Sequence, residues 1–275
     1  PGLPEGLRSQ IHAAAVQLAE AVKYNSLGTF EFLVDVSDLN DHSTFAFIEA
    51  NPRLQVEHTV TEEVTGIDIV RAQLLIAGGQ TLAELGLTQA EIPAPRGYAI
   101  QVRVNMETMR ADGVALPSGG TLTAFDPPMG PGIRVDTFGY VGYTTSARFD
   151  SLLAKVIAHN SSPRFGDAVS RTHRALSEFR IDGAKTNVAF LQAVLEHPDM
   201  RAGLLYTRFI DDHAAALIAA AEAQPQNRLS RPAPGGPADL VRAGAQVDAN
   251  DPLAVLSFGK QAGGRPTGLA PGAAA

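Results

Sequence analysis

The residues best suited to chemistry lie close together in one stretch of the chain, FIEANPRLQVEH at residues 47–58. The stretch opens with apolar residues typical of a buried strand and continues with alternating acids, amides and bases. Polar and charged groups at the end of a buried strand cost free energy unless they are paired or bind something. A binding or catalytic site is therefore predicted here, and a solvated hairpin end is the alternative.

Two carboxylates and an amide are predicted to meet across a β-hairpin. An apolar strand at residues 29–34 carries Glu31, and a polar loop at residues 36–42 connects it to the strand that contains Glu49. In the register centred on that loop, Glu31 lies opposite Glu49, and Asn51 shares their face because side chains alternate along a strand. Like charges in such a position destabilise a sheet, whereas Mg²⁺ is commonly held by carboxylates. The three side chains are therefore candidate metal ligands.

The residues after this hairpin suit a small oxyanion. The planar guanidinium of Arg53 matches such an anion, Gln55 adds neutral hydrogen-bond donors, and Glu57 could accept a proton as a general base. A further arginine, Arg103, lies on the polar face of an alternating strand at residues 98–105. From the residue pattern alone, Arg103 is predicted to be an exposed strand residue without a special role.

The order and spacing of these residues resemble the catalytic end of biotin carboxylases, which are ATP-grasp enzymes within biotin-dependent carboxylases. The resemblance rests on GTFEF at residues 28–32, FIEAN at residues 47–51, RLQVEH at residues 53–58 and VTE at residues 60–62. It implies that the two hairpin carboxylates, with Asn51 beside them, hold divalent cations (Mg²⁺ or Mn²⁺) that bridge the phosphates of ATP.

The same resemblance implies a role for each residue that follows the hairpin. Arg53, Gln55 and the backbone of Val56 would bind bicarbonate. Glu57 would deprotonate the bicarbonate for attack on the γ-phosphate of ATP, and Arg103 would steady the reacting biotin. The implied cofactors are ATP, the divalent cation, bicarbonate and biotin on a carrier domain.

The parent enzyme that the resemblance implies is a ligase with further domains. Its partners would be a biotinyl carrier domain and a carboxyltransferase domain or subunit, the final acceptor an acyl-CoA or pyruvate, and the assembly a homo-oligomer. Arg134 aligns with an arginine that the family uses at a dimer interface, but Pro131 stands where the family has an aromatic residue. A surface arginine is therefore expected at Arg134.

Elements that grip a nucleotide are not evident in the sequence. It contains no glycine-rich loop of the Walker type and no strand–GxGxxG–helix unit. Its lysines, Lys23, Lys155, Lys185 and Lys260, do not lie near such a loop. We expect a C-terminal fragment of a biotin carboxylase that lacks the N-terminal domain and most of the ATP-grasp lid and is inactive by itself. The alternatives are a non-catalytic folding or assembly module of a multidomain carboxylase, and another ATP-grasp carboxylate ligase.

Composition narrows the class of protein. With 45% hydrophobic and 19% charged residues, the 275-residue chain is typical of a soluble globular protein, and its net charge of −7 argues against nucleic-acid and anionic-membrane partners. The sequence has no cysteine, which excludes disulfides and thiolate metal sites. The seven histidines are scattered, so structural or surface roles are expected for them rather than metal ligation. A cytoplasmic protein fits these features best.

The predicted fold is α+β and has three parts. Residues 1–84 correspond to the C-terminal part of an ATP-grasp domain, and residues 85–222 to the biotin carboxylase C-terminal domain, an antiparallel sheet with helices. Residues 223–275 are rich in Pro, Gly and Ala and are expected to form a linker or tail that leads to a biotinyl domain. Further strands are predicted at residues 98–105, 120–125, 133–138 and 152–159, and helices at residues 4–22, 61–65, 68–77, 82–87, 163–179, 187–195 and 206–221.

Overall fold

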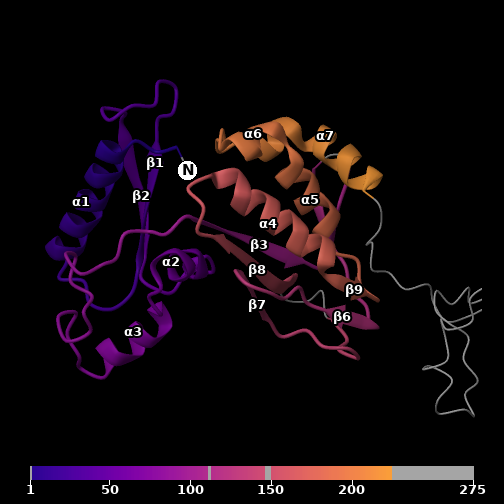
Figure 1. Cartoon of the computed structure of the whole chain (residues 1–275), viewed down its shortest axis with the longest axis horizontal. Helices are drawn as coiled ribbons and strands as arrows, with labels where there is room; N and C mark the ends of the chain where they lie inside the picture. Colours follow the sequence, from indigo (N-terminus) through magenta and orange to yellow (C-terminus); the bar gives the residue numbers. More distant parts are fainter. Residues whose placement is uncertain (1, 111–112, 146–149, 225–275) are drawn as a thin grey trace, which may run out of the picture. The chain divides into compact units, whose positions relative to one another are not determined.

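The structure, a computed structural model, describes residues 2–110, 113–145 and 150–224 (Figure 1). The expected tail from residue 225 onward, and with it the expected link to a biotinyl domain, lies outside the described residues. Of the helices in the described part, none combines the length and the apolar character that crossing a membrane requires.

Helices and strands alternate irregularly along the chain. The helices are α1 (Glu5–Ala21), α2 (His58–Thr65), α3 (Ile69–Ala77), α4 (Phe165–Glu178), α5 (Val188–Glu196), α6 (Pro198–Ala202) and α7 (Phe209–Ala223). The strands are β1 (Thr29–Val34), β2 (Phe45–Asn51), β3 (Tyr98–Asn105), β4 (Glu107–Met109), β5 (Ala115–Pro117), β6 (Ala124–Asp126), β7 (Ile133–Thr137), β8 (Leu152–Asn160) and β9 (Arg180–Asp182). The strands pair antiparallel throughout the described residues, which confirms the predicted α+β class.

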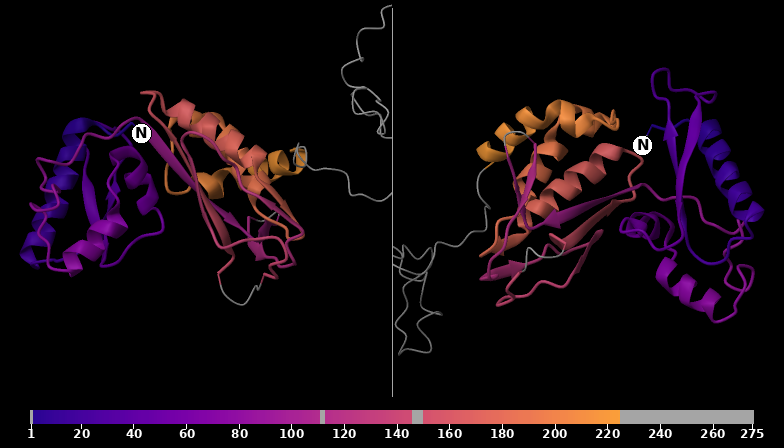
Figure 2. Two further views of the ribbon diagram at one scale, coloured as in Figure 1. Left: turned by 60° about the horizontal axis from the view of Figure 1, so that its bottom comes forward. Right: turned by 180° about the vertical axis from the view of Figure 1, so that it is seen from behind.

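Strands β1 and β2 form the predicted hairpin, and α1 lies beside it in every view (Figures 1 and 2). Glu31 pairs with Glu49, as the loop position predicted. A β-bulge follows, because Phe32 pairs with Phe47 and skips Ile48. Bulges bend a strand and re-aim its side chains. This bulge sets the acidic pair directly beside a ring contact between Phe32 and Phe47, whose centroids are 5.8 Å apart.

The prediction that β2 is a buried strand is wrong. Its five central residues are exposed, among them Phe47 at 47% and Ile48 at 56%. The physical reason is that the hairpin has no third strand among the described residues, and a two-stranded ribbon cannot cover both of its faces. Its aromatic rings shield one another instead, since Phe30 and Phe32 of β1 both contact Phe47.

Helix α2 attaches this hairpin region to the strands that follow. Thr59 in its first turn is fully buried, and the Thr59 hydroxyl donates a hydrogen bond to Oε1 of Gln101 on β3. Gly66 ends the helix with a φ of 77°, a left-handed conformation that glycine adopts without a steric penalty. The helix was predicted to begin only at residue 61, because no capping side chain marks its true start.

The three-stranded sheet β3–β8–β7 forms the centre of the remaining structure, with α4 packed against β8 and β3 (Figures 1 and 2). The helix predicted at residues 163–179 is present as α4, and Val169, Leu176 and the residue after its end, Phe179, are buried. They pack with Val156 of β8 in the main hydrophobic cluster. Thr172 is buried between them and satisfies its hydroxyl by donating to the Ala168 carbonyl at 2.8 Å.

The remaining predictions differ from the structure where elements are short. The prediction of a helix at residues 82–87 is wrong, because that segment forms a single turn in which Gly86 has a φ of 65°. The strand predicted at residues 120–125 reduces to β6 and one isolated bridge between Thr121 and Thr144. Strands β4, β5 and β9 and helix α6 were not predicted, because three to five residues carry too little periodicity to be recognised.

Candidate active site

The acidic residues of the hairpin meet at one amide group. The side-chain nitrogen of Asn51, Nδ2, donates to Oε1 of Glu31 and to Oε1 of Glu49, at 2.9 Å in each case. Glu31 and Glu49 are directly opposed across the strands, where like charges repel one another. The three residues that the sequence singled out as metal ligands are therefore brought together, with the amide between the two carboxylates.

The residues that the sequence assigned to an oxyanion join the same network. Gln55 donates from Nε2 to Oε1 of Glu31 at 3.1 Å, and Arg53 donates from Nη1 to Oε1 of Gln55 at 3.1 Å. A continuous run of hydrogen bonds thus connects the guanidinium to the acidic pair. Gln55 was expected only on the anion-binding side, but it contacts both groups of residues.

This set of donor atoms suits a divalent cation. Glu31 and Glu49 present carboxylate oxygens to the same point, and the Asn51 amide lies at that point. Rotating this amide by half a turn exchanges its nitrogen for its oxygen, which would give three oxygen donors together. Oxygen donors of this kind are the ligands that Mg²⁺ and similar hard cations take.

Glu57 and Arg103 come from distant parts of the sequence and form an ion pair. Nη2 of Arg103, on β3, lies 3.5 Å from Oε2 of Glu57, which immediately precedes α2. The side chains are 53% and 51% exposed, so the pair contributes little to stability. Arg103 is an exposed residue of a strand, as the residue pattern predicted. Its pairing with the predicted general base is what the residue pattern alone did not reveal.

Two side chains hold the peptide units around Val56. The carbonyl oxygen of Gln55 accepts a hydrogen bond from Nδ1 of His58 at 2.8 Å and another from the His58 backbone N–H at 3.2 Å. The carbonyl oxygen of Val56 accepts from Nζ of Lys155 at 3.4 Å. Lys155 was not among the predicted site residues. A signal for it existed, because it interrupts the apolar run of residues 152–158 in strand β8.

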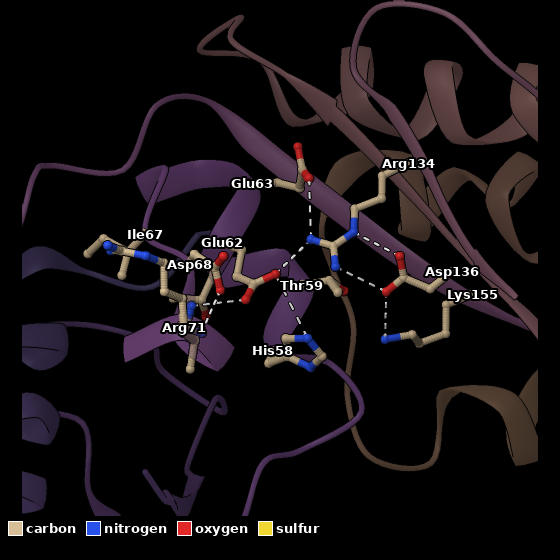
Figure 3. A network of polar contacts seen from close by, with 12 residues as sticks. His58, Thr59, Glu62, Glu63, Ile67, Asp68, Arg71, Arg134, Asp136 and Lys155 are labelled. Carbon is tan, nitrogen blue, oxygen red and sulfur yellow. Dashed lines mark hydrogen bonds and ion pairs between the residues drawn. The ribbon is translucent and has the colours of Figure 1, made fainter. Parts of the chain in front are cut away.

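Arg134 lies at the centre of the ion-pair network in Figure 3. Its Nη1 is 2.6 Å from Oε2 of Glu62 on α2, and its Nε is 2.9 Å from Oδ1 of Asp136 on β7. Asp136 also pairs with Lys155 at 3.1 Å. The expectation of an ordinary surface arginine is therefore wrong. Its partner Glu62 lies 72 positions away in the sequence, and no local pattern could indicate that contact.

The contacts within this network keep its charges in place. Partial burial by itself would raise the pKa of Asp136, but the hydrogen bonds from Arg134 and Lys155 outweigh that effect and lower the pKa below its usual range. The hydrogen bond to Asp136 in turn raises the pKa of the Arg134 guanidinium, against the opposing effect of burial. Both groups are therefore charged at neutral pH.

One expectation about the histidines needs correction. His197, Asp199 and His213 are not scattered but come together, with one potential ligand atom from each within 4.8 Å of the others. Structural contacts account for this cluster. Nδ1 of His197 accepts from the backbone N–H of Asp199 at the start of α6, and both imidazole rings pack against Phe209.

A cavity of about 900 Å³ lies elsewhere, among α4, β9, α5 and α7. Its wall includes an ion pair in which Nε2 of His173 is 3.0 Å from Oε1 of Glu196. The residues predicted to do chemistry do not line it. The candidate active site is therefore the polar surface at the end of the hairpin and not this cavity.

Known proteins are similar to this chain in both sequence and fold. Residues 101–212 match the biotin carboxylase C-terminal domain, and residues 1–85 match the ATP-binding domain of the carbamoyl-phosphate synthase L chain. A pyruvate carboxylase of Aspergillus niger is 45% identical over 211 residues, which cover 76% of this chain and 17% of that protein.

Two solved structures of biotin carboxylase domains are also similar to this chain in sequence and fold. The biotin carboxylase domain of a single-chain bacterial carboxylase is 47% identical, with a TM-score of 0.73 over 81% of this chain and 49% of that chain. The biotin carboxylase domain of a thermophilic 2-oxoglutarate carboxylase, solved with bicarbonate bound, is 36% identical with a TM-score of 0.70, over 78% of this chain and 46% of that chain.

The two family matches thus place sequence of an ATP-binding domain ahead of a biotin carboxylase C-terminal domain in one chain. The chain is homologous to the biotin carboxylase region of pyruvate carboxylase and related biotin-dependent carboxylases, and its residues 101–212 belong to the biotin carboxylase C-terminal domain family. It spans only 17% of the length of the curated pyruvate carboxylase that it matches.

Proposed function

We propose that this chain supplies the bicarbonate-binding and proton-abstracting part of the active site in an enzyme that uses ATP and bicarbonate to carboxylate biotin. The linked network supports this assignment most strongly. Arg53 and Gln55 suit an anion and are hydrogen-bonded to each other, and Gln55 also donates to Glu31 of the acidic pair, which suits a cation. A reaction between bicarbonate and metal-bound phosphate needs the two kinds of site side by side.

In this proposal, Glu31, Glu49 and Asn51 hold Mg²⁺ or Mn²⁺ together with the phosphates of ATP. When bound, such a cation neutralises the charge that develops on the phosphates. The hydrogen bond from Gln55 to Glu31 then keeps the acidic pair at a constant distance from the anion site. Because both carboxylates project from the rigid ladder of β1 and β2, their separation is set by strand pairing rather than by a loop.

Bicarbonate would be bound by the guanidinium of Arg53, the side-chain amide of Gln55 and the backbone N–H of Val56. Glu57 would take the proton from bicarbonate, and the resulting anion would attack the γ-phosphate to give carboxyphosphate and ADP. Before that transfer Glu57 is paired with Arg103. Protonation removes the charge on Glu57 and releases Arg103 to stabilise negative charge on the carboxyphosphate and the reacting biotin.

The proposal extends to partners. Biotin would arrive on a carrier domain, and a carboxyltransferase domain or subunit would pass the carboxyl group to an acyl-CoA or a keto acid such as pyruvate. A homo-oligomeric, cytoplasmic parent enzyme is part of the same proposal. The exposed, polar surface around Arg103 and Glu57 leaves the reacting groups accessible to a tethered substrate.

The general base can be tested in a complete carboxylase that contains this chain. Glu57→Gln keeps the size and polarity of the side chain but cannot accept the proton, so bicarbonate-dependent ATP cleavage should fall by roughly a hundredfold or more. The affinity for ATP, measured by fluorescence or calorimetric titration, should change little. Glu20→Gln, on the exposed face of α1, is the matched control and should leave turnover unchanged. Near-normal turnover of Glu57→Gln would remove Glu57 from the role of base.

A further inference from the structure

The contacts around Val56 close into a ring of polar groups that no single element contains. Oε2 of Glu62 lies 3.8 Å from Nε2 of His58, which completes the path between the two carbonyl groups that flank Val56. We call this path the Val56 ring, and it runs from the Gln55 carbonyl through His58, Glu62, Arg134, Asp136 and Lys155 to the Val56 carbonyl. Figure 3 shows its five side chains.

The ring holds two consecutive peptide units. A peptide group is planar, so fixing its carbonyl oxygen also fixes the N–H on its opposite side. The Gln55 carbonyl, held by His58, therefore sets the direction of the Val56 N–H. The Val56 carbonyl, held by Lys155, likewise sets the direction of the Glu57 N–H in the next peptide group. The two backbone positions nearest the chemistry are thus each tied by one side chain.

Lys155 is a cation at a largely buried position in its sheet. It lies on the central strand of its sheet, opposite Arg103 on β3 and opposite Asp136 on β7. Its side chain is 13% exposed, between the buried neighbours Ala154 and Val156. Two cations side by side across strands repel one another, and burying a lysine costs further free energy. Asp136 compensates part of this cost at 3.1 Å.

The rest of the ring is firmly held. The side chains of His58 and Glu62 are 11% and 10% exposed, so solvent and salt screen their contacts less than those of surface pairs. The second oxygen of Glu62, Oε1, accepts the backbone N–H of Ile69 at 3.0 Å, which fixes the carboxylate between α2 and α3. The path from the β3–β8–β7 sheet to the Val56 backbone therefore includes two largely buried side chains, one of them tied to the backbone of Ile69.

We propose that Lys155 is a positioning residue for the bicarbonate site: with His58 it clamps the peptides on either side of Val56, so that the Val56 N–H and Glu57 face the same anion. This inference rests on the proposed function for its chemical meaning. The clamp itself is a property of this chain and can be measured without any activity.

The clamp is tested first by amide hydrogen exchange on the full chain. Lys155→Met keeps the length of the aliphatic stem and removes the ammonium group, so exchange in residues 53–58 should accelerate by about tenfold, since local opening becomes easier. Lys155→Arg should restore most of the protection, because a guanidinium can also donate to the Val56 carbonyl. Lys185→Met, at an exposed lysine outside the ring, should leave exchange in this segment unchanged.

The chemical role is tested in a complete carboxylase that contains the chain. Lys155→Met should raise the KM for bicarbonate on the order of ten- to a hundredfold. The KM for ATP should stay close to its original value, because the hydrogen bonds of the acidic pair go to the side chains of Asn51 and Gln55 and not to the five side chains of the ring. A lysine that served only to stabilise the fold would not separate these two constants, and Lys155→Arg would not restore one of them selectively.

The exchange experiment decides whether the clamp exists, and the kinetic experiment decides whether it positions bicarbonate. Unchanged exchange at residues 53–58 in Lys155→Met overturns the clamp, whatever the enzyme does. Faster exchange with an unchanged KM for bicarbonate overturns its role in positioning the anion. If the unmodified carboxylase shows no bicarbonate-dependent ATP cleavage, the proposed function fails, while the exchange experiment still decides the clamp. Should Lys155→Met not fold, His58→Ala opens the ring at the other peptide, and unchanged exchange there would equally overturn the clamp.

Discussion

The region before β3 and the region from β3 onward differ in what holds them together. Among the described residues before β3, only Leu7 and Thr59 are buried, whereas the main hydrophobic cluster lies entirely in the later region. Yet almost all of the residues proposed to do chemistry lie in the earlier region. The hairpin and the residues that follow it thus hold most of the groups proposed to react, and the β3–β8–β7 sheet with its helices contains the core.

The difference shows how an exposed site can still be well ordered. Groups proposed to bind ATP, a cation and bicarbonate must be reachable, so they cannot be fixed by burial. They are fixed by contacts to the later region instead, at Thr59, at Glu57 and at the Val56 carbonyl. The geometry of the site therefore depends on a few polar contacts made by a sheet in which only Arg103 is proposed to contact the reacting groups.

The largest effect should come from the core of the later region. Phe179 is 2% exposed and packs against Phe125 with ring centroids 5.3 Å apart. Phe179→Ala should lower the free energy of unfolding by about 3–5 kcal/mol, because it removes buried area and leaves a cavity. Urea denaturation measures this, with Phe138→Ala, at a half-exposed ring, as the control. A loss below about 1 kcal/mol would contradict the placement of the core.

A smaller effect is expected where the two regions join. Thr59→Val keeps the shape of the buried side chain but removes the hydroxyl that donates to Gln101. The loss should be about 1–3 kcal/mol, because the Gln101 oxygen is left without its donor. Thr61→Val, at an exposed position two residues along α2, is the matched control. Equal melting temperatures for the two variants would show that this junction does not contribute to stability.

Acid should weaken the same junction through Asp136. Its folded-state pKa is lowered, so the ionised form favours the folded state. This stabilisation is complete above the ordinary aspartate value of about 3.9 and is lost as the pH falls through the lowered folded value. Asp136→Asn should therefore be less stable than the unmodified chain at neutral pH, and the difference should shrink in acid. A difference that stays constant with pH would contradict the ion pairing of Asp136, and Asp38→Asn, at an exposed position, is the control.

The smallest effect should come from the hairpin itself. Phe47 is half exposed and contacts Phe30 and Phe32 across the strands. Phe47→Ala should cost roughly 0.2–1 kcal/mol, which is the range for a cross-strand aromatic pair. Chemical denaturation measures the difference. If Phe47→Ala lowered the free energy of unfolding as much as Phe179→Ala, Phe47 would belong to a hydrophobic core. The two regions would then not differ in how they are stabilised.

How far the sequence predicts this site depends on how local each contact is. The pairing of Glu31 with Glu49 follows from strand alternation and loop position, and the structure confirms it. The contact of Asn51 with both carboxylates follows from the same face. The burial of β2 was predicted wrongly, because an apolar pattern shows which face seeks cover and not whether a covering layer is present.

What the sequence determined by itself is the set of chemical groups: two opposed carboxylates with an amide, followed by a guanidinium, a second amide and a base at alternating positions. Spacing along one strand and the next few residues fixes their order in space, since neighbours in the chain cannot separate. Only the tertiary structure decided how these groups are held. Lys155, Arg134 and Thr59 reach their partners from other elements, and such contacts depend on how α2 docks onto the sheet, which no local pattern of residues encodes.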